Sequence, residues 1–511
     1  MKRIALFKIN LSNLLAFFAG CLLTLAFAPF SLFPLAIFSP ALLLWLWLPV
    51  TPKQAFWRGW FYGLGFFGTS VYWVFISIHT FGNAPIPLAA LITGGFIALL
   101  ALFPAFNGYL LNRFFPEKNG RKMICAFPAI WVLLEWVRSW LCTGFPWVLL
   151  GDSQLYSPLK GFAPIYGVFG VSLAVLVCSG ILVHAICNSI KGKYKSVYGS
   201  LFSFILVWLV GGALTFIVWT HPQGKPIQVS LVQGNIPQDV KWSPDHLQPT
   251  LDRYLALTRA HWDSQIIIWP EDAIPLPLQN AVSFVSQLDT EAREHHVSLI
   301  TGIPVQKDST GDYYNAVIVI GASTDAYLKH QLVPFGEYTP IPSLLKPVMR
   351  LFDIPMSNLT ANTGKPRPIT VNGIKIATFI CYEIAYPELV VSAGTDIGML
   401  LTVSNDAWFG HSIASAQHLA IAQMRALEMG RPLLFVSNTG ITAIIKPNGM
   451  IQSVAPIDKT AVLTDSVQPT QGKTLWQRRS MDAILILLVL LLVSTIKYQR
   501  RLKKKMKMRV R

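Results

Sequence analysis

Long apolar stretches are the feature that most limits how this chain can fold. A helix needs about 20 apolar residues to cross the hydrocarbon core of a bilayer, and such stretches follow one another through the N-terminal part of the chain. Of the 511 residues, 53% are hydrophobic and only 13% are charged, which is typical of a membrane protein. We predict membrane spans at 11–28, 32–48, 59–78, 86–111, 123–140, 162–186, 201–219 and 483–496.

The basic residues predict how these spans are oriented. Lysine and arginine gather before the first span, in alternate loops between spans, and in the tail 497–511. Loops rich in these residues stay in the cytoplasm, so we expect both termini there and the polar stretch 221–480 on the extracytoplasmic side. Arg478 and Arg479, before the last span, are the exception. We therefore interpret the net charge of +17 as a topology signal that faces anionic lipid, with no nucleic-acid partner.

This reasoning divides the chain into three parts. Residues 1–220 are predicted to form a transmembrane bundle of seven spans, residues 221–480 one extracytoplasmic domain, and residues 481–511 the final span with a basic cytoplasmic tail. In the middle part, short β-branched runs alternate with helical stretches, which favours a layered α/β domain. Strands are expected at 227–233, 264–269, 298–303, 315–320, 374–380, 399–404, 433–438 and 442–445, and helices at 246–261, 281–294 and 413–429. Pro447-Asn448-Gly449 is expected to form a hairpin turn.

Cys381 is the first candidate for chemistry in the polar domain. It ends the apolar run 374–380, whereas the other five cysteines lie in or beside predicted spans. An unpaired thiol in a compartment where disulfides form calls for an explanation. A thiol at the end of a strand is placed for nucleophilic attack, but a free cysteine is also often a small buried core residue. The spacing alone leaves both interpretations open.

Glu271 and Lys329 are the other two candidates. Glu271 directly follows the apolar run Ile266-Ile-Ile-Trp-Pro270, where a poorly solvated carboxylate suits a general base. An ammonium group such as that of Lys329 can lower the pKa of a nearby thiol and stabilise an oxyanion. Taken singly, each residue has an ordinary alternative, namely a loop acid for Glu271 and a solvated surface lysine for Lys329.

Together with their flanking motifs, these residues resemble a known family. Trp-Pro-Glu271, Lys329 and Cys381-Tyr-Glu follow the order of the Glu–Lys–Cys set of the nitrilase superfamily. Further motifs are similar to its apolipoprotein N-acyltransferase branch, and the resemblance covers almost the whole chain. These motifs are Lys329-x-x-Leu-Val-Pro-Phe-Gly-Glu337, Ser404-Asn-Asp-Ala-Trp-Phe-Gly410, Arg425-Ala-Leu-Glu428, Val232-Gln-Gly-Asn-Ile-Pro-Gln with Lys241-Trp242, and Thr143-Gly-Phe-Pro-Trp147.

The resemblance implies a fold and a reaction. The fold is an α-β-β-α nitrilase-like sandwich joined to a bundle of about eight transmembrane helices. In the reaction, an acyl chain moves from a phospholipid to the N-terminal amino group of the S-diacylglyceryl-cysteine of an apolipoprotein. The resemblance places this step at the outer face of the bacterial cytoplasmic membrane, without a cofactor. It implies Glu271 as the base, Cys381 as the nucleophile that forms a thioester, and Lys329 as a partner of the oxyanion.

Four further residues match positions that the family uses in its site. Glu337 is expected to orient Lys329 or relay a proton, and Trp242 to contact substrate or gate the site. The backbone N–H of Tyr382 is expected to help hold the oxyanion, with Glu383 beside it. For Trp242, Tyr382 and Glu383, support of the scaffold is the alternative. No Cys or His spacing predicts a metal site.

Two further features remain outside this set. The Pro-rich segment 334–362 is interpreted as a lid or membrane-dipping segment, with an ordinary packed loop as the alternative. Glu135 and Arg138, three residues apart on the fifth predicted span, are interpreted as a structural pair, with a contact to a lipid headgroup as the alternative.

Two rival functions follow from the same residues. A membrane-tethered nitrilase-type amidohydrolase would use Glu271, Lys329 and Cys381 in the same way, but water would resolve the thioester. A transporter with an extracytoplasmic accessory domain is disfavoured, because the predicted spans contain almost no ionisable residues.

Overall fold

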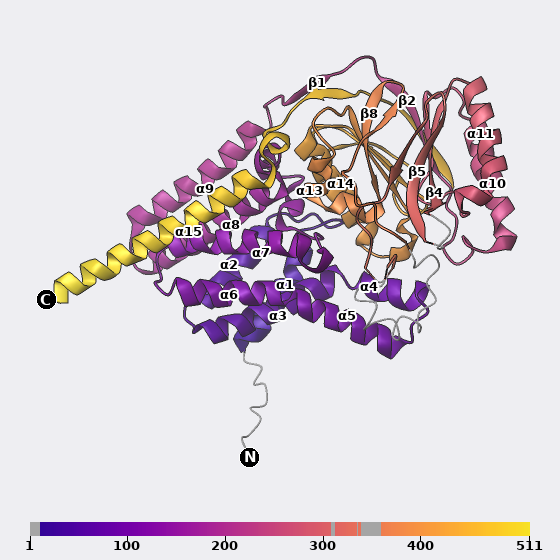
Figure 1. The fold of residues 1–511 in the computed structure, drawn as a ribbon. Helices are drawn as coiled ribbons and strands as arrows, with labels where there is room; N and C mark the ends of the chain where they lie inside the picture. The colour runs from indigo at the N-terminus through magenta and orange to yellow at the C-terminus, as the bar shows by residue number, and fades with distance from the viewer. Residues whose placement is uncertain (1–10, 308–311, 335, 339–358, 511) are drawn as a thin grey trace. The chain divides into compact units, whose positions relative to one another are not determined.

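The computed structural model describes residues 11–307, 312–334, 336–338 and 359–510, and the chain forms two compact units (Figure 1). The first unit comprises Met1–Tyr72, Ala90–Ile217 and Met481–Arg511. The second comprises Val218–Ser480 together with Trp73–Ala89, a segment that the sequence places among the predicted spans. Most of the predicted lid segment 334–362 lies outside the described residues.

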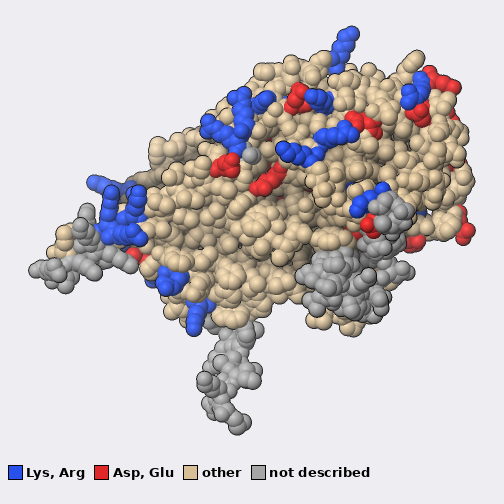
Figure 2. Space-filling view, in the orientation of Figure 1, with Lys and Arg blue, Asp and Glu red and all other residues tan. Residues whose placement is uncertain are grey.

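Apolar helices build the first unit. Large apolar side chains on these helices remain exposed, for example Phe202 at 67% and Leu490 at 59%. Broad areas over this unit are free of Lys, Arg, Asp and Glu in Figure 2. Exposed apolar surface of this extent is what contact with lipid requires. The main helices are α1 (Leu11–Thr24), α2 (Leu35–Trp47), α3 (Pro52–Ser70), α6 (Leu102–Phe114), α7 (Phe127–Trp140), α8 (Ala163–Ile190) and α9 (Tyr194–Leu214), while α5 (Ile86–Leu100) and α15 (Leu475–Val510) begin in the second unit and continue into the first.

The number of helices that could cross a membrane differs from the predicted eight. Among the described residues, five helical segments are long and apolar enough, or six if one bent pair counts as a span. The first two predicted spans are α1 and α2, which have only 14 and 13 residues. The third is bent by 55° between α3 and the segment Trp73–Phe81. Hydropathy marks apolar sequence but does not mark where a helix ends or turns, and helix length and composition alone do not test the expected eight spans, which stay a prediction.

Two six-stranded sheets form the centre of the second unit. One has the strand order β13-β2-β3-β4-β5-β6 and the other β12-β11-β10-β9-β8-β7. The first sheet contains β2 (Ile227–Gln233), β3 (Ile266–Ile268), β4 (Ser298–Gln306), β5 (Tyr313–Gly321), β6 (Asp325–Leu328) and β13 (Ala461–Val467). The second contains β7 (Ile369–Val371), β8 (Ile374–Ile380), β9 (Met399–Ser404), β10 (Leu433–Ser437), β11 (Ala443–Ile445) and β12 (Ile451–Val454), and a two-stranded sheet pairs β1 (Thr220–Pro222) with β14 (Thr470–Gly472).

Side-chain alternation along the strands explains the layering. Ile266 and Ile268 of β3 face the second sheet, whereas Ile267 between them faces the helices, because successive side chains of a strand point to opposite faces. Helices α10 (Pro244–Arg259) and α11 (Val282–Glu294) cover the first sheet, and α13 (Pro387–Ser392) and α14 (Ala414–Met429) lie beside the second (Figure 1). The predicted α-β-β-α sandwich is therefore confirmed.

The predicted strands in the centre of each sheet agree with the structure. The runs 227–233, 374–380 and 399–404 are β2, β8 and β9 with the same bounds. The predicted turn joins β11 to β12, with Gly449 at φ +77° and the Lys446 N–H donating to the Met450 carbonyl at 2.8 Å. Strands β6, β7, β12 and β13 were missed, because their alternation of buried and exposed residues is incomplete or their runs are short.

Candidate active site

Strand ends bring the three predicted catalytic residues into one cluster. Cys381 directly follows β8, Lys329 directly follows β6, and Glu271 follows β3 after Trp269 and Pro270. Charge interactions link the Cys381 thiol to both Glu271 and Lys329, and the side chains of Glu271 and Lys329 are in direct contact. The structure thus assembles residues that lie more than 50 positions apart in the sequence, because each follows a strand of the sandwich.

Cys381 occupies a turn with an unusual backbone conformation. Its φ is +54°, in the left-handed region that non-glycine residues seldom adopt, and a short 3-10 helix, Cys381–Ala385, begins at this residue. Backbone strain of this kind persists where the surrounding structure holds it in place, and it is frequent at functional sites. The turn makes a sharp change of direction directly at the end of a buried strand, which sets the position of the thiol.

Glu271 and Glu337 share the ammonium group of Lys329. The Lys329 Nζ lies 2.7 Å from Glu337 Oε1 and 3.3 Å from Glu271 Oε1. The Asn315 Nδ2 donates to the same two oxygens, at 2.8 Å to Glu271 and 3.3 Å to Glu337. The Val333 N–H donates to the other Glu337 oxygen at 2.7 Å. Lys329 is buried, with 1% of its surface exposed, so two carboxylates balance one buried cation and hold it in a defined position.

The pKa values of Cys381 and Lys329 are both raised, but for different reasons. Burial raises the pKa of the Cys381 thiol well above its ordinary value; the negative charge of Glu271 adds to this effect, and Lys329 opposes it. Burial by itself would lower the pKa of Lys329, but Glu337, Glu271 and Cys381 raise it well above its ordinary value. The expected lowering of the thiol pKa by Lys329 is therefore present but outweighed, and the resting cysteine is a thiol beside an ammonium group.

Glu383 ties the nucleophile turn to the segment after Lys329. One carboxylate oxygen accepts the N–H groups of His330 at 2.6 Å and Gln331 at 3.0 Å. The other accepts the Ile380 N–H at 2.7 Å and the Tyr327 hydroxyl at 3.0 Å. Burial raises the pKa of Glu383 to about 7. These four contacts support the scaffold interpretation of Glu383.

Tyr382 and Trp242 each have a neighbouring side chain near the ring. The Tyr382 ring packs edge-on against the Tyr386 ring, with centroids 5.2 Å apart. The Trp242 side chain is half-buried, and the ammonium group of Lys241 lies 5.9 Å from its ring centroid. The half-buried position of Trp242 leaves part of its surface accessible for contact with a substrate.

Lys241 is a second buried cation of the site, and the sequence reasoning missed it. Its Nζ donates to the backbone carbonyl of Glu271 at 3.0 Å. Burial lowers the pKa of Lys241, whereas Asp272, Glu271 and Cys381 act to raise it. Burial also raises the pKa of Asp272 to about 7. Lys241 lies beside Trp242 within a motif that the resemblance had already singled out, and this position was the available signal.

Glu135 and Arg138 support a loop of the first unit. Glu135 Oε1 accepts the Leu150 N–H at 2.9 Å, and Arg138 donates to the carbonyls of Phe145 and Trp147 at 2.8 Å and 2.7 Å. These contacts agree with the structural interpretation of the pair.

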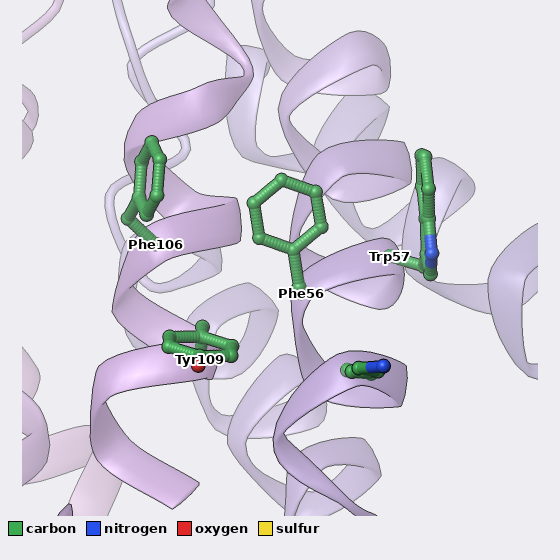
Figure 3. Close-up of a pocket in the computed structure, with 5 residues that line it drawn as sticks. Phe56, Trp57, Phe106 and Tyr109 are labelled. Atoms are coloured by element: carbon green, nitrogen blue, oxygen red, sulfur yellow. The ribbon is translucent and has the colours of Figure 1, made fainter. Parts of the chain in front are cut away.

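A separate hollow in the first unit has a volume of about 200 Å³. Figure 3 shows Phe56 and Trp57 of α3 and Phe106 and Tyr109 of α6, which line the hollow together with Lys53. The ring centroids of Phe56 and Phe106 lie 5.6 Å apart. Its wall is mainly aromatic, and none of Glu271, Lys329 and Cys381 lines it, so it is separate from the candidate active site. Among the described residues, no group of three or more His, Cys, Asp or Glu side chains could hold a metal ion.

Comparison with known proteins agrees with this geometry. Residues 19–181 match the family described as the apolipoprotein N-acyltransferase N-terminal domain, and residues 228–474 match the carbon-nitrogen hydrolase family. The apolipoprotein N-acyltransferase of Coxiella burnetii is 46% identical over 95% of this chain and 100% of its own length. Those of Photobacterium profundum and Azotobacter vinelandii are each 41% identical, over 90% and 94% of both chains. The chain belongs to the apolipoprotein N-acyltransferase family.

Proposed function

We propose that this chain transfers a fatty acyl group from a phospholipid to the N-terminal amino group of an S-diacylglyceryl-cysteine on an apolipoprotein. The observation that carries the proposal is the cluster of Cys381, Glu271 and Lys329 at the strand ends of the sandwich. A buried thiol, a carboxylate base and a fixed cation are the groups that acyl transfer through a thioester needs. The apolar exposed helices of the same chain favour a substrate that resides in the membrane.

In the first half-reaction, the raised pKa of Cys381 determines the order of events. Because the thiol is protonated at rest, Glu271 removes its proton as the sulfur attacks the ester carbonyl of the phospholipid. The Lys329 ammonium group and the backbone N–H of Tyr382 hold the oxyanion that forms. The carbon–oxygen bond of the ester then breaks, the lysophospholipid oxygen takes the proton from Glu271, and the acyl chain remains on sulfur as a thioester.

In the second half-reaction, the amino group of the lipoprotein attacks the thioester. Glu271 accepts a proton from the attacking nitrogen, the carbon–sulfur bond breaks, and the leaving sulfur takes that proton from Glu271, which restores the thiol of Cys381 and the carboxylate. Glu337 keeps Lys329 in place throughout, since the Lys329 Nζ lies 2.7 Å from its carboxylate. Trp242, half-buried beside Lys241, is proposed to contact one of the two substrates.

The basic loops extend the proposal to topology. We assign the chain to the bacterial inner membrane, with both termini in the cytoplasm and residues 221–480 on the periplasmic side. This assignment is supported by the clustering of Lys and Arg in alternate loops and in the tail. In this orientation, the catalytic domain faces the compartment in which exported lipoproteins carry their free N-terminal amine.

The experiment that separates transfer from hydrolysis follows the fate of the acyl group. Purified protein is loaded with a phospholipid carrying one labelled acyl chain and then mixed with a synthetic diacylglyceryl-cysteine peptide. The proposal predicts label on the peptide amine, and no comparable release of free fatty acid. Label that appears only as free fatty acid, at the same rate with and without peptide, would instead establish the amidohydrolase-like alternative in which water is the acceptor.

A further inference from the structure

His418 lies beneath the nucleophile turn, in a position that the sequence motifs did not indicate. It belongs to α14, and none of its surface is exposed. Its Nε2 lies 3.1 Å from the backbone carbonyl oxygen of Cys381, and its Nδ1 lies 3.0 Å from Asp406 Oδ1. The rings of Phe409 and Phe435 meet the imidazole edge-on, with centroids 6.1 Å and 5.0 Å away. The ring is thus held on both nitrogens and from two sides.

The partners of His418 define where protons are needed. A carbonyl oxygen can only accept, so Nε2 must carry a proton that it donates to Cys381. Asp406, which meets Nδ1, is itself fixed, because the Ser404 hydroxyl donates to its Oδ1 at 2.7 Å and its own N–H donates to the Ser437 hydroxyl at 3.2 Å. Asp406 therefore holds the imidazole in one orientation, with Nε2 toward the Cys381 carbonyl.

This donor acts on the residue whose backbone is strained. Cys381 has φ of +54°, and the peptide group that contains its carbonyl also contains the N–H of Tyr382. Fixing the carbonyl oxygen therefore fixes the direction of that N–H, which is the proposed second donor to the oxyanion. It also limits rotation of the Cys381 backbone, on which the direction of the thiol depends.

We propose that His418 is a positioning residue, whose Nε2–H holds the Cys381 carbonyl and thereby aligns the thiol and the Tyr382 N–H, with Asp406 fixing the ring. The proposal rests on the role of Cys381 as the nucleophile. Asp406 follows β9 of the second sheet and His418 belongs to α14, whereas Glu271 and Lys329 follow strands of the first sheet.

The test compares His418→Leu with His418→Gln. Leucine fills a similar space but cannot donate, whereas the glutamine amide can place an N–H close to the position of Nε2. The rate of acyl-enzyme formation is measured in a single turnover with labelled phospholipid, as a function of lipid concentration. A displacement of about 1 Å at a reacting group costs about 100-fold in rate, so His418→Leu should slow acylation by that order at saturating lipid. The half-saturating lipid concentration should stay unchanged. His418→Gln should form the acyl-enzyme at least tenfold faster than His418→Leu.

Controls separate positioning from folding and from failure of the proposed function. His411, whose side chain is 94% exposed, receives the same change to leucine and should acylate at the wild-type rate. Rates are normalised to protein that retains cooperative thermal unfolding. If wild type forms no acyl-enzyme, the proposed function fails. If wild type forms the acyl-enzyme and folded His418→Leu forms it at a rate within threefold of wild type, the positioning role is refuted. The role is also refuted if His418→Gln forms the acyl-enzyme no faster than His418→Leu.

Asp406→Ala is a second variant, which keeps the imidazole but removes the oxygen that lies 3.0 Å from its Nδ1. The ring is then no longer fixed toward the Cys381 carbonyl, so this variant should slow acylation at least tenfold without changing the half-saturating lipid concentration. Acylation at the wild-type rate by folded Asp406→Ala would contradict the role given to Asp406.

Discussion

Replacing Glu337 with glutamine removes one charge from the centre of the site while keeping its shape. In the native protein, the Lys329 Nζ lies 2.7 Å from Glu337 Oε1 and 3.3 Å from Glu271 Oε1. Glutamine can keep its oxygen toward Lys329, but its amide nitrogen then faces the Val333 N–H, which donates to Glu337 at 2.7 Å in the native protein. The contact from Lys329 is thus weakened, and the hydrogen bond from the Val333 N–H is lost.

The expected magnitude follows from these two contacts. A hydrogen bond to a charged group contributes about 1.5–3 kcal/mol and a neutral one about 0.5–1.5 kcal/mol. Removing a partner from a buried ion pair costs about 3–5 kcal/mol when nothing replaces it, but Glu271 remains as a partner of Lys329. We therefore expect a loss of about 1.5–3 kcal/mol in the positioning of Lys329. At 1.36 kcal/mol for each factor of ten in rate, acylation should slow about 10–100-fold.

The assay is single-turnover acylation of Cys381 at saturating phospholipid, with thermal unfolding measured in parallel. Glu294→Gln is the matched control, because Glu294 is exposed on α11 and the change of charge is the same. The pKa of Lys329 should also fall in Glu337→Gln, since Glu337 is the largest of the charges that raise it. The variant should therefore lose activity at a lower pH than wild type on the alkaline side. Acylation within threefold of wild type in folded Glu337→Gln would refute the role given to this carboxylate.

Two further predictions follow from the site. Burial and Glu271 raise the pKa of Cys381, so the rate at which iodoacetamide alkylates this thiol should be low at pH 8 and should still increase above pH 9. Peptide mapping follows the reaction, with the exposed Cys142 as internal reference. A rate that reaches a plateau below pH 8 would contradict the resting thiol. A methyl group added at Gly302 would lie 2.6 Å from both the Pro270 carbonyl oxygen and the Asp272 nitrogen and 2.7 Å from the Glu271 Cα. Gly302→Ala should therefore displace the base and slow acylation about 100-fold. Gly373 has open space around it, so Gly373→Ala should retain the wild-type rate even if its stability falls.

The strand ends explain why much of the site could be predicted. Glu271 and Cys381 follow buried apolar runs, which drew attention to them although each had an ordinary alternative. The family resemblance joined Lys329 to them and added Glu337. The direction of the thiol pKa could not be predicted, because it depends on how burial and Glu271 compare with Lys329 in three dimensions.

Other contacts required the folded structure. His418 meets the Cys381 carbonyl only because α14 packs under the turn after β8, and no sequence spacing shows this. The contacts of the segment Trp73–Phe81 also cannot be read from sequence spacing. Its Ser77 hydroxyl donates to the Trp408 carbonyl at 2.7 Å, and Trp73 and Phe409 are in ring contact at 4.8 Å. An apolar helix face has the same composition whether protein or lipid covers it, so the sequence gives no sign of these contacts.

Intact-mass spectrometry of the full-length protein after incubation with a defined phospholipid tests the central claim most directly. The account predicts that wild type gains the mass of one fatty acid less water, that peptide mapping places it on Cys381, and that hydroxylamine removes it as a thioester. Cys381→Ala should gain nothing under the same conditions. Folded wild type that turns over phospholipid and peptide without such an adduct, or an equal adduct on Cys381→Ala, would contradict the account.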